Sequence, residues 1–238
     1  MIEESTKEKL RNMKLTEMLE AYEDEELTLS HLDMTFDQRF AHLIEDTYQR
    51  KYNRTVARLI KSAHFRYNCD ISGIVYKDGR NLDKTLMIEL AACDFIRANK
   101  ALIITGSAGT GKTWISCAIG KQACKLGYKT QYIRMPDLFE RAGIYGSRKT
   151  IDKYSKYDLL ILDEWLLYPL EDAELTLMLE LLERRYDSKS TVFATIYATT
   201  EWYPRLGEAV RADSIMERIV HNKIDVTLGS LNMRAEQH

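Results

Sequence analysis

The octapeptide Gly106-Ser107-Ala108-Gly109-Thr110-Gly111-Lys112-Thr113 occupies every fixed position of the phosphate-loop pattern G-x-x-x-x-G-K-[ST]. Small residues let the backbone curl, so that successive N–H groups face a phosphate and the following helix adds its positive amino-terminal end. Lys112 is expected to reach the β- and γ-phosphates of a nucleotide, and the Thr113 hydroxyl is expected to bind Mg²⁺. The octapeptide therefore predicts binding of a nucleoside triphosphate.

The residues around the octapeptide follow the order that a phosphate loop requires. Ala101–Thr105 form a short apolar run before it, which predicts a buried parallel strand. Apolar residues recur at helical spacing after it, up to Gly127, which predicts a helix. This order favours nucleotide binding over a glycine-rich turn that binds nothing. The expected nucleotide-binding residues are Gly106, Ser107, Ala108, Gly109, Thr110, Gly111, Lys112, Thr113 and Trp114.

A second motif supplies two adjacent acids. Leu159–Leu162 are apolar and are followed directly by Asp163 and Glu164. A buried strand would deliver both carboxylates to the carboxyl edge of the sheet, where open α/β sheets bind their ligands. Asp163 is expected to hold Mg²⁺, and Glu164 to orient or polarise an attacking water. The alternative is a strand that merely ends in solvated acids.

One string could suggest guanine recognition. Asn222–Asp225 match N-K-x-D, which GTPases place at the end of an apolar strand. Here the string follows Ile215, Met216 and Ile219, whose spacing is helical. GTPases also carry a glycine three residues after the acid of the second motif, where this chain has Leu166. We therefore expect the nucleotide to be ATP.

Composition excludes several classes of protein. The 238 residues allow one α/β domain with a small appendage, and 34 Lys+Arg against 36 Asp+Glu indicate no particular partner. No apolar stretch approaches the ~20 residues of a membrane-spanning helix, and the N-terminus lacks a signal profile. Four cysteines without a C-x-x-C pair are typical of buried free thiols. We expect a soluble cytoplasmic protein.

Periodicity divides the chain into three parts. Apolar residues recur every three or four positions over 5–27 and 36–65, so residues 1–67 are expected to form a helical domain. Residues 68–82 are expected to be a linker with an extended piece at 74–76. Residues 83–238 are expected to form an α/β domain of the P-loop NTPase class, since a helix over 83–98 precedes strands that alternate with helices. The strands after the phosphate loop are expected near 130–134, 159–162, 191–197 and 224–228, and helices from 136 and over 172–186 and 213–221.

The chain resembles the IstB-like transposition helper ATPases, which are relatives of the DnaC helicase loaders within the AAA+ class. The resemblance covers nearly the whole length. Besides the two motifs, it rests on 14–21, 36–65, 86–95, 157–164, Glu201-Trp202 and 212–221. It implies an AAA+ core with a parallel sheet between helices, preceded by a small helical domain that contacts a partner, DNA or another subunit. It also implies an Mg²⁺-dependent ATPase of the bacterial cytosol or nucleoid that oligomerises on duplex DNA and regulates a partner transposase.

The resemblance implies further catalytic residues. Arg218 matches an arginine that reaches the γ-phosphate in a neighbouring subunit, and Arg234 matches a terminal arginine that acts like a sensor. Each could instead be an ordinary surface or capping arginine. Relatives often carry Asn or Gln where Ile196 stands, and Thr195 beside it is expected to substitute.

Two basic groups are candidates for DNA contact. Arg50, Arg54 and Arg58 recur every four residues, which suits sequence-tolerant contacts to phosphates, although the acidic residues of 1–46 could pair with them. The second group lies before the strand at 159 and is slightly favoured. It consists of Arg148, Lys149, Lys153 and Lys156. No signature of base-specific recognition accompanies either group.

Three other functions stay open at this level. A helicase loader of the DnaC type would use a similar core to hold a replicative helicase and single-stranded DNA. An ATP-gated scaffold would hydrolyse little ATP. The apolar Ile196, at a position where relatives often carry Asn or Gln, is consistent with such slow hydrolysis. A small-molecule kinase is a distant fourth, because the sequence shows no acceptor pocket.

Overall fold

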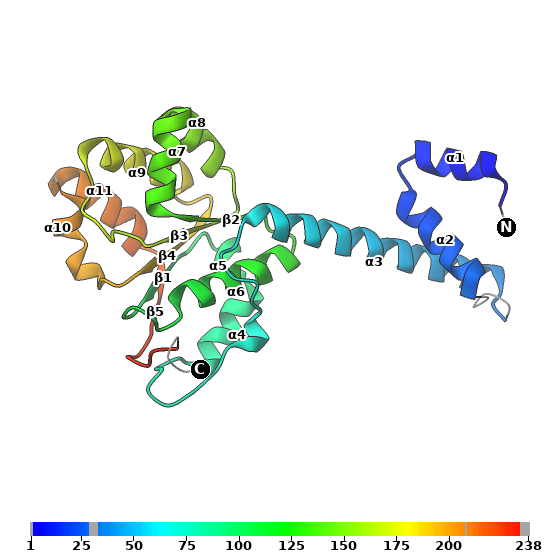
Figure 1. Ribbon diagram of the computed structural model, residues 1–238, viewed down its shortest axis with the longest axis horizontal. Coiled ribbons are helices and arrows are strands. Elements are labelled where there is room, and N and C mark those ends of the chain that lie inside the picture. The colour runs from blue at the N-terminus through cyan, green and yellow to red at the C-terminus, as the bar shows by residue number, and fades with distance from the viewer. Residues whose placement is uncertain (1, 29–32, 208, 234–238) are drawn as a thin grey trace. The chain divides into compact units, whose positions relative to one another are not determined.

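The computed structural model describes residues 2–28, 33–207 and 209–233 (Figure 1). The chain forms two compact units, residues 1–58 and 59–238. The division falls inside the long helix α3, Phe36–Ala63, and not at the expected residue 67. Leu59 and Ala63 pack with Cys124 of the second unit, which explains why the last turn of α3 belongs there.

The first unit consists of α1 (Glu4–Asn12), α2 (Thr16–Thr28) and the first part of α3. The helical stretch expected over 5–27 is interrupted at Lys14, whose φ of 58° is left-handed. Few side chains of this unit are buried, and acid–base pairs join its helices instead. Arg39 of α3, for example, pairs with Glu25 of α2 at 2.9 Å.

The second unit is built on a five-stranded, wholly parallel sheet in the order β2-β3-β4-β1-β5. The strands are β1 (Ala101–Thr105), β2 (Thr130–Arg134), β3 (Leu159–Asp163), β4 (Ser190–Thr195) and β5 (Lys223–Thr227). All five lie close to their expected positions. The expected α/β fold with a parallel sheet is therefore confirmed.

Helices cover both faces of the sheet (Figure 1). Leu102 and Ile104 of β1 face a core shared with α6, while Ile103 between them faces a second core shared with α9 and α11. This alternation follows from the two-residue repeat of a strand. One layer holds α4 (Lys84–Ala92), α5 (Asp94–Arg97) and α6 (Lys112–Lys125), and the other holds α7 (Met135–Tyr145), α8 (Ser147–Tyr154), α9 (Asp172–Arg185), α10 (Tyr203–Leu206) and α11 (Ala209–Val220).

One local expectation is wrong. The helix expected over 83–98 is split at Cys93, where a left-handed φ of 59° separates α4 from α5. The backbone is extended at Ile74, within the extended piece expected at 74–76; this piece follows a 3₁₀ turn at Ile71–Gly73 and joins no strand of the described chain. The expected linker, residues 68–82, is part of the second unit, and Cys69, Ile74 and Arg80 are buried there.

All four cysteines are buried free thiols, as expected. Burial raises the pKa of Cys69 and of Cys93 to about 12, so both remain protonated at neutral pH. Among the described residues, none of the helices has the length and apolar character to cross a bilayer.

Arg185 is a charged side chain in the interior of the second unit, with 1 % of its surface exposed. It donates to the carbonyls of Tyr157 at 2.8 Å and Tyr154 at 3.1 Å, and to the hydroxyl of Thr191 at 3.0 Å. It also donates to the carbonyl of Ser190. The guanidinium therefore ties the end of α8 and the start of β4 to α9.

We expect Arg185→Leu to lower the free energy of unfolding by about 2–4 kcal/mol, because several buried carbonyls would lose their donor. Chemical denaturation followed by circular dichroism measures this loss. Arg184→Leu is the matched control, since Arg184 is partly exposed and pairs with Asp152 and Glu180. It should cost about 1 kcal/mol or less. Equal losses of stability in the two variants would contradict the role of Arg185 in joining α8 and β4 to α9.

Candidate nucleotide-binding site

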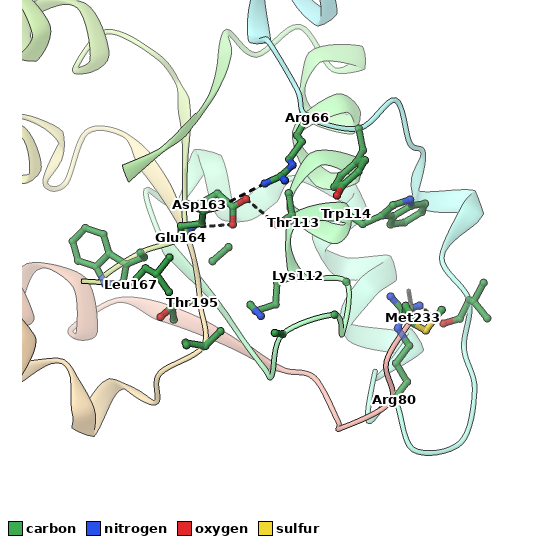
Figure 2. A pocket seen from close by; sticks show the side chains of 18 of the residues that line it. Arg66, Arg80, Lys112, Thr113, Trp114, Asp163, Glu164, Leu167, Thr195 and Met233 are labelled. Carbon is green, nitrogen blue, oxygen red and sulfur yellow. Dashed lines mark hydrogen bonds and ion pairs between the residues drawn. The ribbon is translucent and has the colours of Figure 1, made fainter. Parts of the chain in front are cut away.

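A cavity of about 520 Å³ opens at the carboxyl ends of β1, β3 and β4 (Figure 2). The phosphate loop forms one wall, the two acids at the end of β3 form another, and residues 66–80 close a third side. This is the edge at which parallel α/β sheets bind their ligands. The expected residues that line it are Ala108, Gly109, Gly111, Lys112, Thr113, Trp114, Asp163, Glu164 and Thr195.

The loop between β1 and α6 requires its glycines. Gly109 and Gly111 have φ of 86° and 96°, which favour glycine over any residue with a side chain. A Cβ on Gly109 would also lie 2.3 Å from the side-chain oxygen of Asn232. Gly106, Ser107 and Thr110 complete the loop, and the Thr110 hydroxyl donates to the Ser107 carbonyl at 2.9 Å.

Lys112 begins α6 and lies along its own loop. Its ammonium donates to the carbonyls of Gly106 at 2.7 Å and Ser107 at 2.8 Å. These acceptors hold the ammonium at the mouth of the loop, where the amino-terminal end of α6 also faces. An anion in the loop would therefore meet a cation and a helix N-terminus together.

Asp163 ends β3 and is the centre of a hydrogen-bond network. One of its oxygens accepts from the Thr113 hydroxyl at 2.8 Å and from the Tyr132 hydroxyl at 2.7 Å. The other accepts from the backbone N–H of Glu164 at 3.0 Å. Burial and the neighbouring carboxylate raise the pKa of Tyr132, so its hydroxyl remains a donor.

This network can hold Mg²⁺. Thr113 and Asp163 offer two hard oxygen ligands side by side, and Mg²⁺ binds proteins through one or two such groups, with phosphate and water completing its shell. Within the described residues there is no cluster of three or more acids, histidines or cysteines that would suit another type of metal site. The oxygen pair at the phosphate loop fits the ion expected there.

Glu164 follows Asp163 with a left-handed φ of 58° and lies between two arginines. Arg66 is 3.5 Å from one carboxylate oxygen, and Arg134 is 3.6 Å from the other. Neither Arg66 nor Arg134 is among the site residues predicted from the sequence. Arg134 ends β2 and pairs in register with Asp163, so the expected strand boundaries could have located it.

Thr195 is the last residue of β4, and Ile196 lies just beyond the strand. The Thr195 side chain is buried and its oxygen accepts from the backbone N–H of Tyr197 at 3.1 Å. Ile196 is 42 % exposed, and both residues line the cavity. Thr195 is thus the polar residue nearest to the expected sensor position along the chain.

Arg218 does not line the cavity of its own chain. It pairs with Glu183 and donates to the Ser214 carbonyl at 2.6 Å, and it lies by a small hollow that also touches Asn99 and Ala101 at the amino end of β1. A contact with nucleotide would therefore have to be made in another subunit. Arg234 lies outside the described residues.

The two basic groups differ in their surroundings. Arg50 pairs with Asp24 and Asp46, and Arg54 pairs with Glu17 and Glu20, whereas Arg58 is exposed. The second group is exposed on and after α8 and pairs with no carboxylate of the described chain. It borders an open hollow that is lined by Lys129, Lys149, Lys153 and Lys156 together with Asp152 and Tyr157.

The N-K-x-D string lies at the wrong end of the sheet for guanine recognition. Lys223 begins β5 and pairs in register with Ala101, the first residue of β1. The phosphate loop follows the other end of β1, after Thr105. The position of the string agrees with the choice of ATP.

Comparison with known proteins identifies relatives over the whole chain. The family model described as IstB-like ATP binding protein matches residues 8–238. An insertion sequence ATP-binding protein of Sinorhizobium fredii is 30 % identical, covering all of this chain and 98 % of that protein. The ATP-binding protein of insertion sequence IS1162 from Pseudomonas fluorescens is 34 % identical, covering 82 % of this chain and 87 % of the relative.

Solved structures share the fold. DnaI superimposes with a TM-score of 0.58 at 22 % identity, covering 74 % of this chain and 93 % of DnaI. The DnaC helicase loader superimposes with a TM-score of 0.55 at 21 % identity, covering 68 % of this chain and 97 % of that structure. The second unit therefore has the fold of AAA+ P-loop ATPases.

We expect Lys112→Ala to lower the affinity for ATP by at least about a hundredfold, because the loop would lose its charge-assisted donor to the phosphates. Titration calorimetry with Mg²⁺ and ATP measures the loss. Lys84→Ala, which removes an exposed lysine at the start of α4, is the matched control and should bind as the wild type does. Unchanged affinity of Lys112→Ala would refute the assignment of the phosphate loop.

Proposed function

Because the chain belongs to the family of IstB-like ATP-binding proteins, we propose that it is an ATP-hydrolysing transposition helper that assembles on duplex DNA and recruits and regulates a partner transposase. ATP hydrolysis would then reset the assembly. The observation that carries the proposal is that the phosphate loop lines the same cavity as Asp163 and Glu164, with a hydrogen bond from Thr113 to Asp163. Relatives named for insertion sequences span nearly the whole chain, which favours transposition over helicase loading.

The cavity supports binding of Mg²⁺ and ATP. Backbone N–H groups of the loop and the Lys112 ammonium would hold the phosphates. Thr113 and Asp163 would hold Mg²⁺, which neutralises charge on the β- and γ-phosphates when it is bound. Tyr132 would keep Asp163 oriented through its 2.7 Å hydrogen bond.

Glu164 is the proposed base for hydrolysis. Its carboxylate now faces Arg66 and Arg134, and turnover requires that it accept a hydrogen bond from water instead. Thr195 would help to position that water from the end of β4. The arginine contacts are long for ion pairs and partly exposed, so exchanging one for water costs little.

Arg218 is proposed to act on the nucleotide of a neighbouring subunit. Its side chain lies at the amino end of β1 in its own chain, remote from the loop, and would exchange Glu183 for a γ-phosphate. Catalysis would then depend on a homo-oligomer, since each site would need one residue from the next subunit. Arg234 is proposed as a sensor on the resemblance alone.

DNA contact is proposed for the exposed group on α8. Arg148, Lys149 and Lys153 have no carboxylate partner among the described residues, so each can neutralise a phosphate. Arg50 and Arg54 already pair with acids of the first unit, so they are less available to bind DNA phosphates. Such contacts fix a protein on duplex DNA without reading its sequence.

Hydrolysis can be tested by mixing two inactive variants. Glu164→Gln should bind ATP but lose turnover because it lacks the base, and Arg218→Ala should do the same because it lacks the donated cation. In a mixture, an Arg218→Ala subunit keeps Glu164 and can receive Arg218 from a Glu164→Gln neighbour. We therefore expect a steady-state ATPase assay to recover about a quarter of the wild-type rate in an equimolar mixture, if single competent sites act independently.

Two outcomes would contradict this arrangement. Turnover by isolated Arg218→Ala monomers would exclude a role in trans. Turnover that is unaffected by Glu164→Gln would exclude hydrolysis at this site.

The DNA contact predicts a change in salt dependence. Replacing Arg148 and Lys149 together by Ala should weaken binding to duplex DNA of any sequence and reduce the slope of log affinity against log salt by about two. Fluorescence anisotropy at several salt concentrations measures the slope. Arg50→Ala with Arg54→Ala is the matched control and should leave the slope unchanged. If the slope fell only in the variant at Arg50 and Arg54, the DNA contact would lie on α3 instead.

A further inference from the structure

One arginine that lines the cavity has no role in the steps above. Arg80, from the segment between α3 and α4, is 3 % exposed. Its Nη1 donates to the Val75 carbonyl, while its Nε is buried without any partner. No carboxylate of the described chain pairs with it. Within the described residues, Arg80 is therefore a buried cation that lacks a counter-charge and one hydrogen-bond acceptor.

Arg80 lies beside the phosphate loop. A Cβ on Gly111 would be 3.0 Å from its Nη2, so the guanidinium touches the residue that precedes α6. Figure 2 shows Arg80 and Met233 at the side of the cavity opposite Glu164, with Lys112 between them. The guanidinium is thus next to the loop but remote from the end at which the γ-phosphate is expected.

The backbone holds Arg80 in this place. Its carbonyl accepts from the N–H of Gly229 at 2.8 Å, and a Cβ on Gly229 would lie 2.1 Å from the Gly79 carbonyl oxygen. The next part of the same C-terminal segment is tied to the loop, since Met233 N–H donates to the Gly109 carbonyl at 2.9 Å. The guanidinium is therefore positioned before any ligand arrives.

An unpaired buried cation is unfavourable for stability. Removal from water disfavours its charged form, and burial accordingly lowers the pKa of Arg80. A single bond to the Val75 carbonyl does not require a charge, so a merely structural role does not account for an arginine here. A ligand that supplies negative charge and acceptor oxygens would account for it.

We propose that Arg80 binds the α-phosphate of the nucleotide, an inference that rests on the proposed binding of ATP. Backbone N–H groups of a phosphate loop surround the α- and β-phosphates, and its lysine reaches the β- and γ-phosphates. Arg80 touches the loop at Gly111 on the side away from Glu164, which leaves the α-phosphate as the anion within its reach. Residues 68–82 would then sense whether a nucleotide is bound, but not whether it is ATP or ADP.

The test uses the full chain with Arg80→Met, which removes the charge and keeps the length of the side chain. Titration calorimetry should show that the affinities for Mg²⁺-ATP and for ADP fall by the same factor, about tenfold to a hundredfold. The ratio of ATP to GTP affinity should stay as in the wild type, because an α-phosphate contact does not read the base. Arg97→Met, at an exposed arginine of α5, is the matched control and should change nothing.

Stability without nucleotide separates binding from structure. Arg80→Met should unfold in urea at the same or a higher concentration than the wild type, because it removes an uncompensated buried charge. A structural arginine would instead make the nucleotide-free protein less stable. Arg80→Gln, which keeps an N–H donor for Val75, serves in the same assays if Arg80→Met does not fold, and it should show the same loss of affinity.

Three results would overturn the proposal: unchanged affinity, a loss confined to ATP, or an altered ratio of ATP to GTP affinity. Loss of stability without nucleotide in both variants would also overturn it. A wild-type protein that binds neither ATP nor ADP would refute the proposed function itself. Wild-type binding with unaltered binding by Arg80→Met would refute only the role of Arg80.

Discussion

The hydrogen bond between Thr113 and Asp163 is the contact on which the candidate site depends. It joins two segments 50 residues apart at a distance of 2.8 Å. The bond can form because β1 and β3 are parallel and separated only by β4, so both end at the same edge of the sheet. A parallel sheet buried on both faces leaves little freedom to shift this register.

Charge in the cavity is arranged around that contact. Lys112, Arg66 and Arg80 line the cavity together with two carboxylates, Asp163 and Glu164. The cations outnumber the acids, as a site for a polyphosphate requires. Arg66 lies shortly after the end of α3, and its guanidinium is 3.5 Å from the carboxylate of Glu164, the proposed base.

The chain uses its charges differently in the first unit. There, arginines of α3 pair with acids of α2 and of α3 itself, and these pairs replace much of the apolar packing that joins helices in the second unit. Partly exposed pairs of this kind contribute little stability each and weaken with salt. Arg148 and Lys149 lie on α8, where no acid of the described chain neutralises them, and they therefore remain available to an external anion.

The amino-acid sequence alone determined the class of the fold, the order of strands and helices, the phosphate loop and the adjacent acids of β3. These follow from local patterns, because the period of apolar residues distinguishes strands from helices and the loop motif is contiguous. Only the tertiary structure decided that Arg66, Arg80 and Arg134 meet the site, since Arg66 and Arg80 come from the segment between α3 and α4, Arg134 comes from the end of β2, and none of them belongs to a motif. It also decided that Cys93 splits a helix and that acids neutralise Arg50 and Arg54, because backbone strain and long-range pairing leave no periodic trace in a sequence.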